Sequence, residues 1–566
     1  MLKSIYLILL STLFLVSCKP VKQSDIPFKK DIKKKLTATE LKTWYQKDYQ
    51  EDAIPGISLD KWYRLNKKKP KTEVIVAVID TQIDKNHEDL QGQLWTNNKE
   101  IPNNGIDDDD NGYVDDTQGW NFTAKKDSYI VWGNFEYVRL IRDFQGKFEG
   151  QNETTVSKDD LLNFKEYLRA KKKLEEEVTY YKKKEVSQKY GVSVFPIAKD
   201  SLRHYFPKED YTIEQLDSLY KIYKINDKTL RQRREDNDRD LGAMISFMKF
   251  RFEVGEKSLS DVIDFEIQID SILNKNLNIN FDERKFIGDN PNILEKGYGS
   301  KNISISKEGH RSFQDHNTKV SGIIAANRNN NLGIKGIAEN VKIMPLTISY
   351  SGDEHDKDIA MAVYYAVDNG AKVINMSFTK EFSLKQQWVS EAFKYAEKHN
   401  VLLVHISGNE SFDIDKNPSY PSDNNFDGTG EICNNFINVG ATSNRVDGTF
   451  LYELSNYGKQ NVDLFAPGDD IYSTAAGNTY EYDSGTSLAA PMVSGTAALI
   501  WSYYPELTAA EVKQIIMDSG TSYDLQVIVP GTKDKKVPFS ELSKSGKVLN
   551  VYNAMQLADK VSKKKK

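Results

Sequence analysis

The chain has 566 residues, 39% of them hydrophobic and 28% charged, which is enough for a packed core with a solvated remainder. At roughly 150 residues per domain, this length fits about three to four domain-sized units, or one large core with an insertion. Lys and Arg total 77 against 82 Asp and Glu, a net charge of -5, which excludes a polybasic nucleic-acid binder. Only two cysteines, Cys18 and Cys433, are present, which excludes a disulfide scaffold and a multi-cysteine zinc module.

The N-terminus has the features of an export signal. A lysine precedes the apolar run 5–16, which is shorter than the roughly 20 residues that a membrane span needs. The run ends in Leu15-Val16-Ser17-Cys18, which resembles the lipobox of bacterial lipoproteins. That resemblance implies a signal peptide at 1–17 and lipidation of Cys18. It also implies an exported protein anchored to a cell-envelope membrane, facing the periplasm or the surface. The alternative is an ordinary signal peptide with an incidental cysteine.

Apolar runs alternate with helix-like stretches in most of the chain. Residues 18–70 are polar and lysine-rich, and we expect a lipid-anchored tether with a short lead-in at 57–65. Four β-branched or apolar runs then predict strands buried on both faces of a parallel sheet: 74–79, 341–344, 373–376 and 401–406. Stretches such as 358–369 and 385–399 read as helices between them. This alternation predicts an α/β fold, a mostly parallel sheet with helices on both faces.

One segment interrupts this alternation. Residues 125–292 are rich in Lys, Glu, Asp, Tyr and Arg, and the stretches 161–181 and 230–252 read as long helices with solvated faces. We interpret the segment as a charged helical insertion whose partner the sequence does not name. It divides the predicted α/β domain into a first part, 71–124, and a second part, 293–556. The last residues, 557–566, are predicted to be a basic, solvated tail.

Three motifs carry an aspartate, a histidine and a serine in that order. Asp80 ends the first predicted strand, where open α/β sheets place ligands. His316 lies near the start of a predicted buried helix, within Asp315-His316-Asn317-Thr318-Lys319-Val320-Ser321-Gly322. Ser487 lies at a predicted helix N-terminus within Gly485-Thr486-Ser487-Leu488-Ala489-Ala490-Pro491, where Pro491 suits the first helical turn.

Together the motifs resemble the subtilisin-like serine proteases (subtilases), over roughly residues 72–122 and 295–555. The resemblance implies a three-layer subtilisin-like fold and a serine endopeptidase that acts on protein or peptide substrates through an acyl-enzyme. It assigns Asp80 as orienting carboxylate, His316 as general base and Ser487 as nucleophile, with no cofactor for catalysis. It also implies that Asn409, after the run 401–407, donates to the oxyanion. Substrate would bind along Ser377, Phe378 and Thr379.

The chain departs from the subtilase pattern at several positions. Gln82, Asn317 and Thr379 stand where glycine is usual, and Lys319 replaces a common histidine outside the triad. Because the triad itself is intact, we expect an active protease with narrowed specificity. One rival is a catalytically impaired subtilase-like binding protein that recognises a partner through the insertion. A second rival, an α/β-hydrolase esterase, is disfavoured because the chain lacks Gly-x-Ser-x-Gly at Ser487 and has the opposite triad order.

An acidic loop at 103–116 predicts a cation site. Asp107, Asp109, Asn111 and Gly112 match the opening of an EF-hand loop, but Gln118 stands where the closing glutamate belongs. We therefore expect a structural calcium in a surface loop, with Asp107, Asp109 and Asn111 as ligands. The alternative is a solvated acidic turn.

Overall fold

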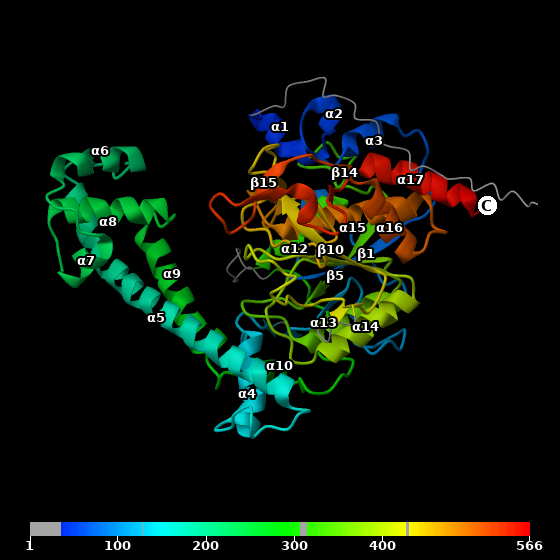
Figure 1. The fold of residues 1–566 in the computed structure, drawn as a ribbon, viewed down its shortest axis with the longest axis horizontal. Helices are drawn as coiled ribbons and strands as arrows, with labels where there is room; N and C mark the ends of the chain where they lie inside the picture. Colours follow the sequence, from blue (N-terminus) through cyan, green and yellow to red (C-terminus); the bar gives the residue numbers. More distant parts are fainter. Residues whose placement is uncertain (1–34, 127, 306–313, 426–429, 566) are drawn as a thin grey trace, which may run out of the picture.

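The computed structural model describes residues 35–126, 128–305, 314–425 and 430–565 (Figure 1). The predicted signal peptide and Cys18 lie outside these residues. Within them, no helix combines the length and the apolar character that a membrane crossing needs.

A mixed sheet forms the centre of the main domain, in the order β14-β17-β11-β10-β7-β6-β1-β5-β2. All its neighbouring strands pair in parallel except β14 and β17. This confirms the predicted α/β fold. The strands are β1 (Val74–Asp80), β2 (Trp120–Asn121), β5 (Val341–Thr347), β6 (Val373–Met376), β7 (Leu402–Ile406), β10 (Phe436–Thr442), β11 (Leu464–Pro467), β14 (Thr521–Ser522) and β17 (Lys547–Val548).

Helices cover both faces of the sheet because its central strands are apolar on both sides. Side chains of α12 (His316–Ala325), α15 (Thr486–Tyr503), α16 (Ala509–Ser519) and α17 (Val551–Lys564) share one core cluster with alternate strand residues. Those of α13 (Asp356–Asp368) and α14 (Gln386–Lys398) pack on the opposite face, where Cys433 is buried. Short hairpins β12 (Ile471–Ala475) with β13 (Thr479–Asp483), and β15 (Gln526–Ile528) with β16 (Lys536–Pro538), complete the domain.

The two ends of the described chain differ from the expected tether and tail. Residues 35–70 form α1 (Ala38–Thr43), η1 (Trp44–Gln46), α2 (Tyr49–Asp52) and α3 (Leu59–Leu65). Trp44 is 0% exposed and donates from Nε1 to the Asp470 carbonyl oxygen at 3.0 Å. These helices are held on the sheet domain because Trp44, Ile54 and Ile57 are buried in the main core. Burial of these apolar side chains stabilises the segment even though lysines are frequent in it. At the other end α17 continues past residue 556, with Ala558 buried.

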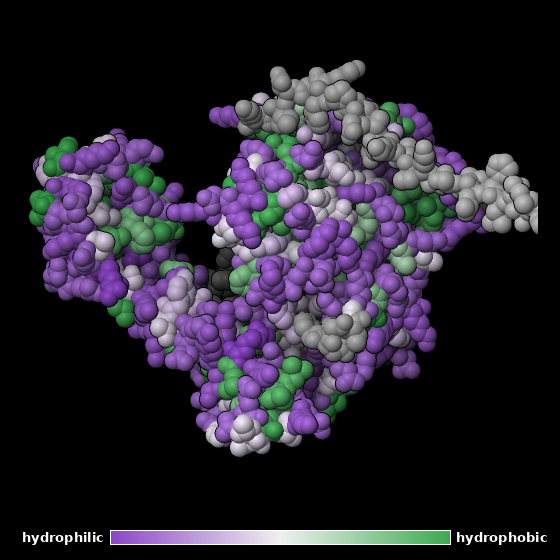
Figure 2. Space-filling model, viewed as in Figure 1, coloured by the Kyte–Doolittle hydropathy of each residue, from purple (hydrophilic) through white to green (hydrophobic). Residues whose placement is uncertain are grey.

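The insertion is an arm of helices that stands out from the sheet domain (Figure 1). Its base is α4 (Glu136–Phe148) and the start of α5 (Leu161–Leu202), and α9 (Leu259–Ser271) returns alongside α5 to α10 (Arg284–Ile287). The far end is a small lobe of α6 (Ile213–Tyr223), α7 (Leu230–Glu235) and α8 (Leu241–Glu253) with its own apolar core. The single helix expected at 230–252 is broken, because Asp240 caps a new helix by accepting from the Ala243 amide. Figure 2 shows a largely hydrophilic arm with apolar patches on the lobe.

Candidate active site

Asp80 and His316 meet at the carboxyl end of the central strand. β1 ends at Asp80, which is 2% exposed, and α12 begins at His316. His316 Nδ1 lies 2.8 Å and 2.9 Å from the two carboxylate oxygens of Asp80. The start of α12 is fixed to the turn after β1, because Asn317 bonds Thr81 through its backbone amide and through its side-chain amide, both at 3.0 Å. Asn317, where glycine was expected, therefore ties these two elements together.

The electrostatic surroundings raise the pKa of His316 above its ordinary value of 6.5. Removal from water lowers this pKa, while the adjacent Asp80 carboxylate, through its charge and its hydrogen bond, raises it by more. Lys319, the other departure on α12, is engaged elsewhere, with its ammonium 2.8 Å from Asp483 and 2.5 Å from Glu481.

Ser487 is the second residue of α15 and is paired with Ser377 beyond β6. Ser377 Oγ donates to the Ser487 carbonyl oxygen at 3.0 Å, and Ser487 Oγ donates to the Ser377 carbonyl oxygen at 3.2 Å. Pro491 lies inside α15 rather than in its first turn. Because proline has no amide hydrogen, it cannot supply the helical bond to the carbonyl four residues earlier, that of Ser487. The Ser377 hydroxyl fills that position.

Asn409 follows β7 and is oriented by the residue next to Ser487. Its Oδ1 accepts from the Thr486 amide at 2.9 Å and from Thr486 Oγ1 at 3.1 Å. With its oxygen held in this way, the Nδ2 group is the end of the side chain left to donate to another acceptor. The first amides of a helix also lack intrahelical acceptors, so this rim favours negative charge.

The predicted substrate segment leads away from this rim. Ser377 and Phe378 are buried, and Thr379 Oγ1 lies 2.6 Å from Ser419 Oγ and 3.1 Å from the Tyr420 carbonyl oxygen. Thr379 therefore carries its side chain toward the 419–420 loop. The structure brings Asp80 to His316, Ser377 to Ser487, and Asn409 to Thr486. In the rotamer described, the Ser487 hydroxyl bonds Ser377 rather than His316.

The acidic loop uses its predicted ligands in two different ways. Asp107 holds the loop itself, because its carboxylate accepts from the amides of Asn111 at 3.1 Å and Gly112 at 2.7 Å. Asn111 also serves the loop, accepting from the Tyr113 amide at 2.8 Å. Of the three expected ligands, Asp109 is the one that joins a carboxylate cluster.

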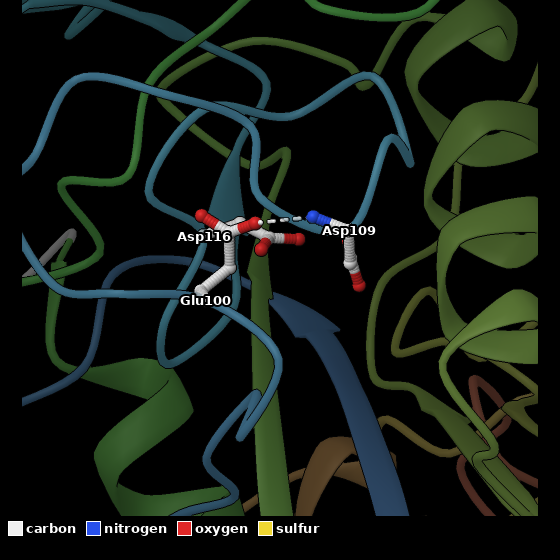
Figure 3. A group of neighbouring side chains, drawn as sticks. All are labelled: Glu100, Asp109 and Asp116. Atoms are coloured by element: carbon white, nitrogen blue, oxygen red, sulfur yellow. Dashed lines mark hydrogen bonds between the residues drawn. The ribbon is translucent and has the colours of Figure 1, made fainter.

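Asp109 lies with Glu100 and Asp116, and one oxygen from each lies within 4.8 Å of the others (Figure 3). Glu100 Oε1 accepts from the Asp109 amide at 3.2 Å, whereas Glu100 Oε2 and Asp109 Oδ1 are buried without a hydrogen-bond partner among the described residues. Glu100 is 6% exposed and Asp116 is 0% exposed. Buried carboxylate oxygens without donors are costly, so the cluster has the charge and the free oxygens to hold a hard cation.

Asp116 is the most enclosed member of this cluster. Burial raises its pKa to about 6, against donors from Tyr365, Asn97 and Asn111 that lower it, and Asp109 adds a repulsion that raises it. Sequence reasoning missed Glu100 and Asp116 because the spacing of an EF-hand loop does not include them. The only signal was their acidity, with Asp116 at the end of the loop 103–116 and Glu100 shortly before it, and folding alone brings them together.

A parallel sheet with polar side chains gathered at the carboxyl ends of β1, β6 and β7 is the usual arrangement of a ligand-binding α/β protein. Residues 71–539 match the Subtilase family, and the chain belongs to that family of serine peptidases. The cell wall-associated protease of Bacillus subtilis (strain 168) is 32% identical over 258 residues, 44% of this chain and 27% of that protein. The thermophilic serine proteinase of Bacillus sp. (strain AK1) is 39% identical over 191 residues, 34% of this chain and 43% of that protein.

The matched region spans less than half the length of these two relatives. Among solved structures, a cold adapted subtilisin-like serine proteinase shares 25% identity over 42% of this chain and 74% of its own, with a TM-score of 0.33.

Proposed function

We propose that the protein is a serine endopeptidase that cleaves peptide bonds with Asp80, His316 and Ser487. The observation that carries this proposal is the short contact between His316 Nδ1 and both oxygens of Asp80, on the rim that also holds Ser487. Asp80 would keep the Nδ1 proton in place, so that Nε2 of the neutral ring is free to act as base.

In the reaction, the Ser487 hydroxyl turns from Ser377 to His316 and attacks the peptide carbonyl as His316 takes its proton. The oxyanion that forms accepts from Asn409 Nδ2 and from the Ser487 backbone amide. His316 then gives its proton to the leaving amine, and the acyl-enzyme remains on Ser487. Water, deprotonated by the same imidazole, hydrolyses that ester and releases the acid product.

The test uses the purified chain, a fluorophosphonate probe and a peptide mixture read by mass spectrometry. We expect the probe to label wild type and the Ser487→Ala variant to lose both labelling and cleavage. A matched Ser502→Ala variant should keep both, because Ser502 is buried near the end of α15 and its hydroxyl donates to the Leu499 carbonyl oxygen of the same helix. Labelling that persists in Ser487→Ala would refute the nucleophile. Absence of label and cleavage in a folded wild type would favour the alternative, a catalytically impaired protein that binds a partner through the insertion.

We also propose export as a lipoprotein, supported by the sequence Leu15-Val16-Ser17-Cys18 after an apolar run. The lipid on Cys18 would hold the enzyme at a cell-envelope membrane. Expression in a bacterium fed an alkyne fatty acid tests this proposal. We expect labelled, membrane-associated wild type and unlabelled Cys18→Ser, while Cys433→Ser, which changes the buried thiol, keeps the label. Label on Cys18→Ser would contradict the assignment.

We further propose a structural calcium held by Glu100, Asp109 and Asp116, a revision of the ligand set expected from the sequence. The support is that two buried carboxylate oxygens in this cluster, Glu100 Oε2 and Asp109 Oδ1, have no hydrogen-bond donor among the described residues. Calcium would cancel their repulsion and fix the loop, and no catalytic step passes through it. Calorimetry should detect calcium binding to wild type and to the exposed-loop variant Asp110→Asn, but not to Glu100→Gln with Asp109→Asn. Unchanged thermal unfolding of wild type after chelation would contradict the proposal.

A further inference from the structure

A cavity of about 210 Å³ opens beside the candidate active site. Thr379 and Glu410 line it. Thr379 lies two positions after Ser377, whose carbonyl accepts from the Ser487 hydroxyl, and Glu410 directly follows Asn409. The cavity is therefore next to the expected oxyanion donor. It also adjoins the segment expected to bind substrate, so the substrate residue bound to Ser487 would lie nearest to it.

The insertion supplies the opposite wall of this cavity. Tyr137 of α4 and Lys173 and Glu177 of α5 line it. The base of the insertion is fixed against the residues that follow Thr379. The Arg169 guanidinium lies 3.5 Å from the centre of the Phe382 ring, and its Nη2 donates to the Glu381 carbonyl oxygen at 2.9 Å. An insertion that projects far from the sheet thus begins as part of the rim of the site.

Carboxylates outnumber cations around the cavity. Its charged lining is Lys173, Glu177, Asp353, Lys380, Glu381 and Glu410. Lys173 Nζ lies 2.7 Å from Glu381 and 3.3 Å from Glu177. Lys380 is fully occupied elsewhere, since its buried ammonium lies 2.8 Å from Asp356 and 3.2 Å from Glu136. One lysine therefore faces several carboxylates, which leaves a net negative surface for a ligand.

The side chain of Glu410 is held in the wall of this cavity. Its Oε2 accepts from Asn456 Nδ2 at 2.6 Å, and Gly408, at a φ of +105°, makes room for it. A Cβ added at position 408 would lie 2.5 Å from that carboxylate oxygen and 3.2 Å from the Thr379 methyl. The carboxylate is therefore held close to Thr379, while Glu410 as a whole remains exposed and open to a ligand.

We propose that this cavity receives a basic side chain, lysine or arginine, on the substrate residue that precedes the cleaved bond. Glu410 on the sheet domain and Glu177 on the insertion select it. The inference rests on the proposed function and assigns the insertion a role in that function, as a wall of the specificity pocket. The cost of removing an ammonium from water is offset here by its attraction to carboxylates on two walls of the cavity. An uncharged side chain would gain nothing from those carboxylates.

Three fluorogenic peptides that differ only in the residue before the cleaved bond test the proposal: lysine, norleucine and glutamate. Norleucine keeps most of the lysine stem and removes the charge. We expect kcat/KM for lysine to exceed that for norleucine by about tenfold or more, and glutamate to be poorest. Each variant is judged by its own ratio of lysine to norleucine, which cancels general losses of activity.

Glu410→Gln and Glu177→Gln should each reduce that ratio, and Lys173→Gln, which removes the cation, should raise it. Glu185→Gln, farther along α5 and paired with Lys189, is the matched control and should leave the ratio unchanged.

Wild type that cleaves norleucine as well as lysine, yet labels at Ser487, would overturn this inference and leave the proposed function standing. A ratio that falls in Glu410→Gln but not in Glu177→Gln would overturn the role of the insertion. Loss of labelling in folded wild type would overturn the proposed function, and this inference with it.

Discussion

At the scale of single residues, several polar groups on the rim are held in place by hydrogen bonds to neighbouring residues. Asp80 accepts from the Thr81 amide at 2.6 Å while it binds His316. Asn409 is fixed through Thr486, and the Ser487 backbone through Ser377. Such contacts fix rotamers before substrate arrives, which lowers the reorganisation that the reaction requires.

Replacing Asp80 with Asn tests the importance of this orientation. An amide can present its NH₂ to His316 Nδ1, which favours the tautomer with the proton on the wrong nitrogen, so we expect kcat to fall by about 10⁴-fold. Initial rates on a peptide substrate measure it. Asp84→Asn is the control, because Asp84 serves the turn by accepting from the Gly477 amide at 2.9 Å. A fall of less than about tenfold in Asp80→Asn would contradict the orienting role.

The raised pKa of His316 predicts the acid limb of the pH profile. The base must be neutral, so kcat/KM is lost as pH falls through the His316 pKa and is regained above it. Because Asp80 raises that pKa, the midpoint should lie above the ordinary value of 6.5. In Asp80→Asn the midpoint should move to lower pH, since the attraction for the proton is gone. Rates at constant ionic strength measure both, and a midpoint below 6.5 in wild type would refute this assignment.

Several site residues are readable from the sequence and others are not. The family motifs identify Asp80, His316 and Ser487 because the flanking residues are local and specific. Glu100 and Lys173 carry no such pattern: Glu100 meets Asp109 and Asp116 only once the loop has folded, and Lys173 contacts Glu381, which lies far along the chain. The role of Pro491, which leaves the Ser487 carbonyl oxygen free to accept from the Ser377 hydroxyl, could not be predicted either. It depends on where α15 begins.

At the scale of elements, the insertion is joined to the sheet domain by buried charge. Arg284 of α10 donates to both oxygens of Asp358 in α13, at 2.8 Å and 2.7 Å, and to Asp289 at 2.9 Å. All three side chains are almost completely buried. The sequence predicted the helix at 358–369 but neither α10 nor these ion pairs, because charged residues in a segment rich in lysine and glutamate were expected to face solvent.

Arg284→Met should weaken this junction strongly. It leaves Asp358 buried without its cation and removes one of the two cations beside Asp289, which keeps Lys357 at 2.9 Å. Losing one partner of a buried pair costs about 3–5 kcal/mol. Denaturant unfolding of wild type and variant measures the change in the free energy of unfolding. The control is Arg231→Met in α7, whose pair with Glu235 is exposed and should contribute less than about 1 kcal/mol. Equal effects from the two variants would show that the junction is not stabilised in this way.

At the scale of the whole molecule, residues 35–70 belong to the folded domain. They lie across one end of it, beside α17 (Figure 1). Composition predicted a tether here because lysines are frequent, with a short lead-in at 57–65, and it did not predict that this lead-in contains the helix α3. The remaining helices are too short for periodicity to show, and long-range burial of their aromatic residues holds them in place.

Trp44→Ala tests whether this segment stabilises the protein. Trp44 is completely buried in the main core and bonds the Asp470 carbonyl, so its truncation leaves both a cavity and an acceptor without its donor. Loss of a buried tryptophan costs about 3–5 kcal/mol, and we expect a single unfolding transition at lower denaturant because the segment shares the core of the sheet domain. Leu65→Ala, 51% exposed at the end of α3, is the control and should change little. If Trp44→Ala unfolded at the same denaturant concentration as wild type, the segment would contribute no stability and the tether interpretation would be restored.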